Sequence, residues 1–242
     1  MRDYAKETDK RVQWIKGLLK DSNAKGIIFG NSGGKDSALV GILCRKATEN
    51  IEGVIMPCSS KQNYESDKED ALALAEKFEI KTSMVDLTDV KNLICEKIEN
   101  AEKPTETAMT NINPRLRMTT LYCLGQTKGY LVAGTGNKSE KYMGYFTKWG
   151  DGAFDFNPIA DLTATEVFEY LKYLNAPSEI IEKSPSAGLF EGQTDEKEMG
   201  VTYKAIDEYI ENGTGNSEDI NIIKKYHNLS KHKRRLPLTF DE

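Results

Sequence analysis

The sequence predicts an α/β fold: a doubly wound parallel sheet with helices on both of its faces. Four short runs that are typical of strands alternate with longer segments of helical periodicity, and they span residues 26–30, 53–57, 81–85 and 130–134. Strands and helices that alternate at this pitch form a parallel sheet covered on both sides. The chain has 242 residues, of which 38% are hydrophobic. That length supports one full core, so we expect a single domain over residues 1–242.

The first elements along the chain are a helix, a strand and a second helix. Residues 10–19 place their apolar side chains at the spacing of one helix face, and the apolar run 26–30 follows them. Helical periodicity resumes from Ala38 to Ala47. The glycine-containing stretch between the strand and the second helix is therefore a turn that carries the chain from one to the other.

The middle of the chain repeats this alternation. The second strand, 53–57, ends at Pro57, because proline lacks the N–H group that a sheet ladder needs. A helix over residues 69–78 leads to the third strand, and a helix over 90–98 follows that strand. A longer helix over 113–127 runs directly into the fourth strand.

Two segments, 100–111 and 184–200, show no clear period. The first is polar and contains Pro104, and the second combines Pro185 with glycines and many acidic residues. Long loops within compact domains are often functional. We therefore expect a mobile loop at 100–111 and a lid, or a loop that orders on binding, at 184–200. The alternative for both is a solvated connection.

Composition excludes several classes of protein. A net charge of −5 argues against a non-specific nucleic-acid binder, and no apolar run approaches the ~20 residues of a membrane span. The N-terminus lacks the apolar core of a secretory signal. The four cysteines form no Cys-x-x-Cys pair, which argues against a zinc site. We expect Cys44, Cys95 and Cys123 to be buried thiols in a protein of the reducing cytoplasm.

The most informative stretch is Ser32-Gly33-Gly34-Lys35-Asp36-Ser37, which follows the first strand and opens a helix. Its glycines allow a ligand to come close to the backbone. The N–H groups and the dipole at the start of the helix favour a bound anion. This combination predicts a phosphate site, where the serine hydroxyls add donors and Asp36 holds a magnesium ion. It is not a Walker A loop, because Asp36 stands where Ser or Thr follows Gly-Lys in that motif. The alternative is a helix N-terminus that happens to contain glycine.

A second candidate segment, Gly134-Thr135-Gly136-Asn137-Lys138-Ser139-Glu140, follows the fourth strand. Ligands of parallel sheets bind beyond the carboxyl ends of the strands, so this segment and the first loop belong to one pocket. Asp36 and Glu140 are expected to clamp one magnesium ion, which prefers oxygen ligands. Taken alone, a glycine-threonine turn is weak evidence, and helix capping by Asn137 or Ser139 is then the better interpretation.

Two further segments carry ring-stacking and charged side chains. Residues 144–155 interleave glycine and aromatic residues with Lys and Asp, which suits a pocket that stacks on a ring and pairs with charged groups. The alternative is an aromatic loop packed on the sheet. The stretch Ser230-Lys231-His232-Lys233-Arg234-Arg235 is strongly basic. On its own, such a stretch favours a solvated tail over a phosphate-binding patch.

In this order, the four segments resemble the ammonia-dependent NAD synthetases, which are N-type ATP pyrophosphatases with a Rossmann-like sheet. The resemblance covers nearly the whole chain, and Asn113-Pro114-Arg115-Leu116-Arg117-Met118 and Pro185-Ser186-Ala187-Gly188-Leu189 also carry it. The elements Thr147-Lys148-Trp149-Gly150-Asp151-Gly152 and His232-Lys233-Arg234 are more specific than the first loop, which many ATP pyrophosphatases share.

The resemblance implies roles for individual residues, in sets that bind ATP, magnesium and deamido-NAD. The residues implied to bind ATP are Gly30, Asn31, Ser32, Gly33, Gly34, Lys35, Asp36, Ser37, Thr135 and Ser186. Those implied to bind magnesium are Asp36 and Glu140. Those implied to bind deamido-NAD are Arg115, Lys148, Asp155, His232 and Lys233. Two positions depart from relatives: Ala164 stands where a lysine often reaches ATP, and Ile55 stands where some relatives have arginine. Lys35 and Lys61 are the candidates to compensate.

The resemblance also implies the reaction. ATP adenylates the nicotinate carboxylate of deamido-NAD and releases pyrophosphate, and ammonia then displaces AMP to give NAD. The loop amides, Lys35 and magnesium neutralise the phosphate charge, and no covalent nucleophile is needed. Asp151 or Asp155 accepts a proton from ammonium. The expected catalytic set is therefore Asp36, Lys148, Asp151 and Asp155.

The source of nitrogen and the competing functions follow from the same sequence. Ammonia rather than glutamine is expected, because 242 residues leave no room for a glutaminase domain. The family also implies a homodimer, with the dinucleotide partly across the subunit interface. The competing readings are a tRNA-modifying adenylating enzyme of the same group, which calls for a basic face or a catalytic cysteine pair, and a nucleotide-binding module without catalysis.

Overall fold

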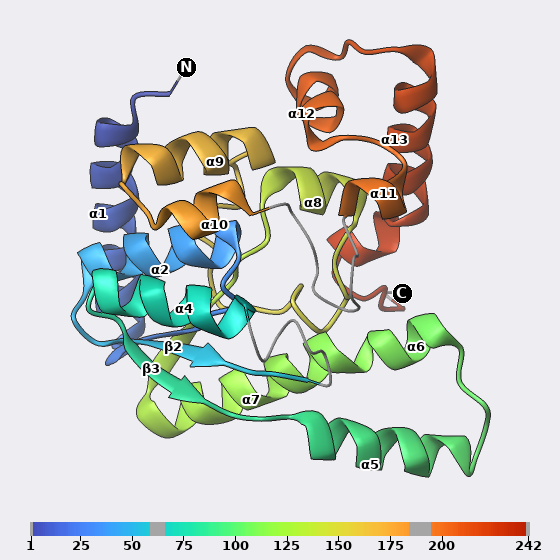
Figure 1. The fold of residues 1–242 in the computed structure, drawn as a ribbon, viewed down its shortest axis with the longest axis horizontal. Coiled ribbons are helices and arrows are strands. Elements are labelled where there is room, and N and C mark those ends of the chain that lie inside the picture. The colour runs from blue at the N-terminus through green and yellow to red at the C-terminus, as the bar shows by residue number, and fades with distance from the viewer. Residues whose placement is uncertain (1, 59–65, 184–194, 241–242) are drawn as a thin grey trace.

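A computed structural model describes residues 2–58, 66–183 and 195–240, and its centre is a four-stranded sheet surrounded by helices (Figure 1). The strands are β1 (Gly26–Gly30), β2 (Ile51–Ile55), β3 (Lys81–Met84) and β4 (Tyr130–Ala133). All their pairings are parallel, and the order across the sheet is β3-β2-β1-β4. The predicted doubly wound α/β fold is confirmed. The second strand lies two residues earlier than the sequence predicted.

One face of the sheet is covered by α1 (Tyr4–Ser22), α2 (Lys35–Ala47), α4 (Ser66–Lys77) and α9 (Ala164–Tyr173), with α10 (Ser178–Glu182) beside them (Figure 1). The side chains of Ile27 and Phe29 point into this layer and belong to the largest buried cluster. Because successive strand residues point to opposite faces, Ile28 points the other way. It packs with Val132 in the second cluster.

The opposite face is covered by α7 (Ile112–Lys128), with α5 (Thr88–Glu99) beside it and the short α6 (Glu106–Thr110) ahead of it (Figure 1). Leu116, Leu121 and Leu124 of α7 pack against the cluster around Ile28. Gly129 ends α7 in a left-handed conformation, with φ of 69°, and the chain turns at once into β4. Helices thus cover both faces of the sheet and bury β1 and β2, whereas the polar edge strand β3 stays partly exposed.

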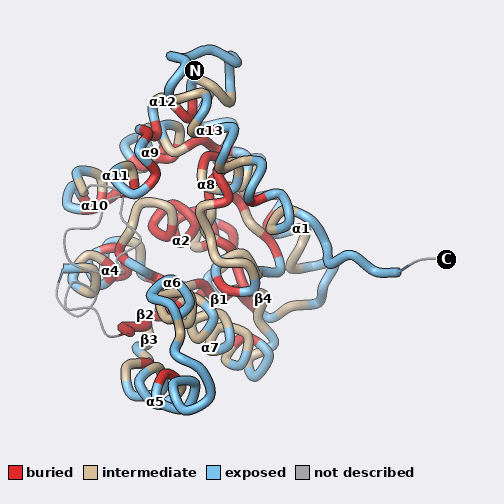
Figure 2. Tube along the Cα trace, turned by 90° about the vertical axis from the view of Figure 1, so that its right-hand side faces the viewer, coloured by how far each residue is buried: buried red, intermediate tan, exposed pale blue. Residues whose placement is uncertain are grey.

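The last helices form a separate layer above the carboxyl ends of β1 and β4. They are α8 (Lys138–Met143), α11 (Asp195–Met199), α12 (Tyr203–Asn212), α13 (Ser217–Leu229) and the 3-10 helix η1 (Lys231–Arg234). Met143, Tyr203, Ile206 and Ile223 belong to their own buried cluster. Figure 2 shows buried segments in α2, β1 and α8, and an exposed C-terminal segment that leads away from the body.

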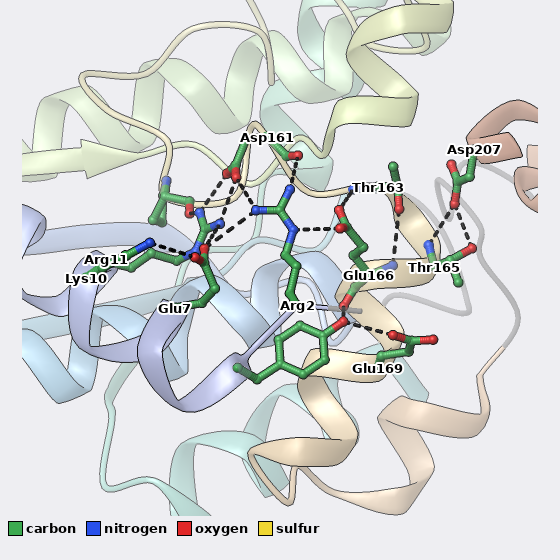
Figure 3. Close-up of polar contacts among 12 residues, drawn as sticks. Arg2, Glu7, Lys10, Arg11, Asp161, Thr163, Thr165, Glu166, Glu169 and Asp207 are labelled. Atoms are coloured by element: carbon green, nitrogen blue, oxygen red, sulfur yellow. Dashed lines mark hydrogen bonds and ion pairs between the residues drawn. The ribbon is translucent and has the colours of Figure 1, made fainter. Parts of the chain in front are cut away.

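A network of ion pairs fixes the start of α9 against α1 (Figure 3). Arg2 Nε lies 2.6 Å from Glu166 Oε1, and two nitrogens of Arg11 lie 2.6 and 2.8 Å from the carboxylate oxygens of Asp161. Glu166 also completes a capping box with Thr163, which satisfies the first N–H groups of α9. The network therefore holds the first turn of α9 in one position, and that turn faces the cavity described below.

Two sequence-based expectations are corrected by the structure. Cys123 is exposed, whereas Cys44 and Cys95 are buried as expected. The segment 100–111 contains α6, because Thr105 accepts a hydrogen bond from the Ala108 N–H and caps a helical turn. Of the segment 184–200 the structure describes 195–200, where α11 forms a helix; the expected lid at 184–194 lies outside the described residues and stays a prediction. Across the ranges that the structure describes, no helix has the length and apolar character that crossing a membrane requires.

Candidate active site

Two loops meet where the neighbouring strands β1 and β4 end. Residues 31–34 connect β1 to α2, and residues 134–137 connect β4 to α8. Strand β1 pairs with β2 on one side and with β4 on the other, so the connections reverse direction at this point of the sheet. Ligands of open parallel sheets bind at such switch points. A cavity of about 930 Å³ lies here.

Most of the predicted ATP- and magnesium-binding residues lie on the wall of this cavity. Of the residues selected from the sequence, the lining includes Gly30, Asn31, Ser32, Gly34, Lys35, Asp36, Ser37, Thr135, Glu140, Asp151 and Lys233. Ile55 and Ala164, the two positions that depart from relatives, line it as well. Gly33 is not among the lining residues. Ser186 and Lys61 fall outside the described residues, so their assigned roles stay predictions.

The loop after β1 has the geometry of an anion site. Gly33 adopts φ of 72°, a left-handed conformation that favours glycine. Gly34 precedes the first turn of α2 and supplies no side-chain cap, so the first N–H groups of this 13-residue helix remain for a ligand. The hydroxyl oxygens of Ser32 and Ser37 lie 3.0 Å apart, and Ser37 Oγ donates to the Gly34 carbonyl at 2.9 Å. These contacts fix the conformation of the loop at the cavity wall.

Asp36 and Glu140 face each other across the two loops. Asn137 Nδ2 donates to Asp36 Oδ1 at 3.0 Å, and the Asn137 N–H donates to Glu140 Oε2 at 3.0 Å. Burial raises the pKa of Asp36 to about 6 despite the Asn137 hydrogen bond and the nearby Lys35 charge. Burial and the charge of Asp36 raise the pKa of Glu140 well above its ordinary value. Two carboxylates held this close, in a poorly solvated site, favour a bound cation.

Asn137 also caps α8, and its side chain forms a capping box with Glu140. The prediction that this residue caps a helix is therefore confirmed. The same side chain also donates a hydrogen bond to Asp36. Within the described residues no group of three or more His, Cys, Asp or Glu side chains is arranged to hold a metal ion. Two carboxylates alone suit magnesium, because that ion usually keeps several waters and takes its remaining oxygens from substrate phosphates.

The basic segment near the C-terminus folds against the cavity. Lys233 Nζ donates to the carbonyl oxygens of Gly144 and Phe146 at 2.8 and 2.7 Å, and it lies 5.4 Å from the centroid of the Phe146 ring. Arg234 Nη1 donates to the Tyr142 carbonyl at 3.2 Å. Burial lowers the pKa of Lys233. A solvated tail is thus the wrong interpretation for these two side chains.

The other predicted deamido-NAD residues lie outside the cavity wall. Arg115 Nη2 donates to the Lys148 carbonyl at 3.4 Å, and Lys148 Nζ donates to the His232 carbonyl at 3.0 Å, so these three residues form one group. Asp155 Oδ2 accepts the Val132 N–H at 2.7 Å, and its Oδ1 accepts from a tyrosine hydroxyl. We call Arg115, Lys148, Asp155 and His232 the outer group.

Several residues of the cavity wall were not selected from the sequence, and Arg117, Asp195 and Lys183 are charged members of this set. Arg117 is held by the Met56 carbonyl at 3.1 Å, and burial lowers its pKa. Asp195 accepts from the Tyr203 hydroxyl at 3.1 Å, and its charge adds to the raised pKa of the two facing carboxylates. Lys183 lines the wall near Lys35. Only Arg117 had a usable signal, since it lies two residues from Arg115 on the same helical segment.

Asp151 lies on the wall between the cavity and the outer group. Its Oδ1 accepts the Thr147 N–H at 2.9 Å, and Thr147 Oγ1 donates to Asn111 Oδ1 at 2.5 Å. Burial raises the pKa of Asp151 in spite of its backbone hydrogen bonds. A carboxylate with a raised pKa at the edge of an anion-binding cavity suits proton transfer.

Known proteins resemble this chain over nearly its whole length. A sequence profile of the NAD synthase family matches residues 7–237. The chain is 46% identical to the NH(3)-dependent NAD(+) synthetase of Carboxydothermus hydrogenoformans, over 97% of each chain. It is 36% identical to the NMN synthetase of Francisella tularensis, with a TM-score of 0.93 and coverage of 100% of both chains. The NH3-dependent NAD synthetase of Campylobacter jejuni is 32% identical, with a TM-score of 0.81 over 99% of this chain and 100% of that one. The glycine-rich turn, the facing carboxylates and these likenesses together place the chain in the NAD synthase family.

Proposed function

We propose that the protein catalyses the ATP-dependent amidation of deamido-NAD by ammonia and releases NAD, AMP and pyrophosphate. One observation carries this proposal: the ends of β1 and β4 bring an uncapped helix start and the Asp36–Glu140 pair to one cavity, in a chain of the NAD synthase family. A triphosphate seated on that helix start presents its α-phosphorus to an acyl oxygen in the same cavity. The reaction forms a carbon–nitrogen bond.

The nucleotide site uses backbone donors and two cations of this chain. The first N–H groups of α2 and the hydroxyls of Ser32 and Ser37 donate to phosphate oxygens. Lys35 and Arg117 line the same cavity and add positive charge. Asp36 and Glu140 would hold magnesium, which would supply positive charge to offset the charge of the phosphates.

The acyl substrate lies toward the segment 144–155. Lys233, on the cavity wall, and the outer group offer cations and donors for a dinucleotide that extends out of the cavity. Asp151 accepts the proton that ammonium must lose before its nitrogen attacks. Asp155 is the weaker candidate for that step, because both of its carboxylate oxygens already accept hydrogen bonds. It would orient substrate instead.

The state of the protein in the cell belongs to the same proposal. Val90 and Leu93 of α5 are 45% and 54% exposed, and such apolar side chains on one helix favour a homodimer. The four cysteines are unpaired, which fits the reducing cytoplasm. Size-exclusion chromatography with light scattering on the wild type and on Leu93→Lys tests the dimer, since a charge at a buried interface position would give monomers.

The decisive assay measures AMP and NAD formation by the purified protein. We expect both products with ATP, magnesium, ammonium and deamido-NAD, little product when glutamine replaces ammonium, and no AMP when tRNA replaces deamido-NAD. Asp36→Ala should remove AMP formation and leave the circular dichroism spectrum unchanged. Deamido-NAD-independent ATP cleavage, or turnover of the Asp36→Ala variant near the wild-type rate, would refute the assignment.

A second candidate is the same chemistry on a mononucleotide. The observation in its favour is the likeness to the Francisella tularensis NMN synthetase, whose TM-score of 0.93 exceeds the 0.81 of the Campylobacter jejuni NAD synthetase. Both reactions amidate a nicotinate carboxylate, so the cavity serves either. Comparing kcat/KM for nicotinate mononucleotide and deamido-NAD separates them. Replacing His232 and Arg115 with Ala should reduce only the dinucleotide activity, because the outer group reaches beyond the cavity.

A further inference from the structure

Lys183 links two elements beside the phosphate loop. It follows α10, and its Nζ lies 2.7 Å from Asp67 Oδ1 and 2.5 Å from Asp70 Oδ2, both in the first turns of α4. These two hydrogen bonds to carboxylates raise the pKa of Lys183 although burial opposes the charge. The ammonium is therefore charged at neutral pH and neutralises much of the negative charge at the start of α4.

The same turn of α4 packs directly on the phosphate loop. A Cβ atom at Gly33 would lie 2.2 Å from the Asp67 carbonyl oxygen and 3.1 Å from Asp70 Cβ. The main chain of Lys183 contacts the residue that follows the loop, because its carbonyl oxygen accepts a hydrogen bond from Lys35 Nζ. Among the described residues, Lys35 makes no ion pair of its own.

These contacts have an electrostatic consequence for a bound triphosphate. Asp67 and Asp70 lie next to the loop that receives phosphate, and like charges brought together in a half-buried site repel strongly. Lys183 offsets that repulsion and at the same time keeps the Lys35 ammonium beside the loop. Lys35 is partly buried and its ammonium donates to a neutral carbonyl, so this second cation gains from a new anionic partner.

We propose that Lys183 is a positioning residue for ATP: its side chain neutralises Asp67 and Asp70 behind Gly33, and its carbonyl oxygen holds Lys35 at the phosphate site. Lys183 itself does not contact phosphate. When ATP binds, Lys35 exchanges the carbonyl for a phosphate oxygen, while the three-membered ion cluster stays intact. The inference rests on the proposed ATP-dependent function and adds to it a residue that controls ATP affinity through its neighbours.

The test is a rescue experiment on the full-length protein. Lys183→Met removes the ammonium that lies against Asp67 and Asp70 behind the loop. We expect KM for ATP to rise about tenfold, the size of one like-charge interaction at a partly buried site. The KM for deamido-NAD should not change. Adding Asp67→Asn and Asp70→Asn to that variant removes the repelling charges, so the KM for ATP should return to within about threefold of wild type. Lys128→Met is the matched control, because Lys128 Nζ lies 2.8 Å from the carboxylate of Glu52 and Lys128 does not line the cavity.

The outcomes separate the proposal from its alternatives. If Lys183 bound phosphate directly, the triple variant would stay as weak as Lys183→Met, and the proposal would be wrong. The cluster could instead serve only to stabilise the fold. The double variant Asp67→Asn/Asp70→Asn would then raise KM for ATP and lower the melting temperature as much as Lys183→Met does. We expect this double variant to bind ATP at least as well as wild type. Calorimetric titration with ATP and magnesium, without a second substrate, completes the design. Wild type that binds no ATP would refute the proposed function, whereas equal binding by wild type and Lys183→Met would refute only the role of Lys183.

Discussion

Replacing Asp36 with Asn should abolish activity and yet stabilise the protein in the absence of ligands. In the folded chain this carboxylate is buried beside Glu140, and its pKa is raised from 3.8 to about 6. A raised pKa in an acid means that the folded state binds a proton more tightly than the unfolded chain does. Stability therefore falls as the pH rises from about 4 through about 6, and the full penalty is present above pH 7.

The magnitude follows from the same shift. The rise is about two pH units, and each unit corresponds to about 1.4 kcal/mol, so ionised Asp36 costs the folded state up to about 3 kcal/mol. Asn keeps an oxygen that accepts the Asn137 side-chain N–H and carries no charge. For a chain of this length, about 1–3 kcal/mol corresponds to a melting temperature higher by about 3–10 °C.

The assay is thermal unfolding of wild type, Asp36→Asn and the matched variant Glu140→Gln at pH 8 and at pH 5. At pH 8 the melting temperature of both variants should be higher than that of wild type. The increase in the double variant should be smaller than the sum of the two single increases, because either change removes the repulsion on the other carboxylate. The gain should shrink at pH 5. Magnesium with ATP should raise the melting temperature of wild type only. A lower melting temperature for Asp36→Asn at pH 8 would show that the ionised Asp36 carboxylate does not destabilise the folded state, and it would refute the argument from its raised pKa.

Three further changes probe the loop, the cap and the outer group. Gly33→Ala should destabilise the fold by about 1–3 kcal/mol in thermal unfolding, since the new Cβ meets the Asp67 carbonyl at φ of 72°, whereas Gly17→Ala, with nothing within 4 Å, should be neutral or stabilising. Asn137→Ala should cost about 1 kcal/mol of stability through loss of the α8 cap and should raise KM for magnesium by freeing the adjacent carboxylate. Asp155→Ala should cost about 1–2 kcal/mol because the Val132 N–H loses its acceptor; reduced turnover with an unchanged melting temperature would instead identify a purely substrate-binding residue.

The sheet and the first loop were predictable because their signals are local. A five-residue apolar run, a glycine turn and a helix start are specified by neighbouring residues, and the structure places all three where the sequence indicates. The facing of Asp36 and Glu140 was predictable for a different reason. Each follows a strand, and parallel strands that lie side by side present their carboxyl ends at one edge. The expectation of one domain stays a prediction.

The contacts around Lys183 were not predictable, because they depend on which segments meet in space. Lys183 and Lys35 are 148 residues apart in the chain, and the bond between them uses a main-chain carbonyl, which no residue type reveals. The prediction of a solvated tail for the basic stretch near the C-terminus was wrong for the same reason. Its charge pattern is that of a solvated tail, but the Gly144 and Phe146 carbonyls accept from Lys233. Cys123 belongs to a helix with an apolar pattern, and its own position on that helix points to solvent.

The segment 144–151 explains why the candidate residues divide into a cavity set and an outer group. One side of this segment faces the cavity through Asp151, and the other side carries Lys148, whose Nζ reaches the His232 carbonyl at 3.0 Å. Thr147 holds the segment in place, because its N–H donates to Asp151 and its hydroxyl donates to Asn111 at the start of α7. Under the proposed function, we therefore expect a dinucleotide whose nicotinate carboxylate lies at the phosphate loop to cross this segment and to place its second nucleotide on the outer group. A mononucleotide would end before the crossing, so we predict that the outer group selects between the two substrates.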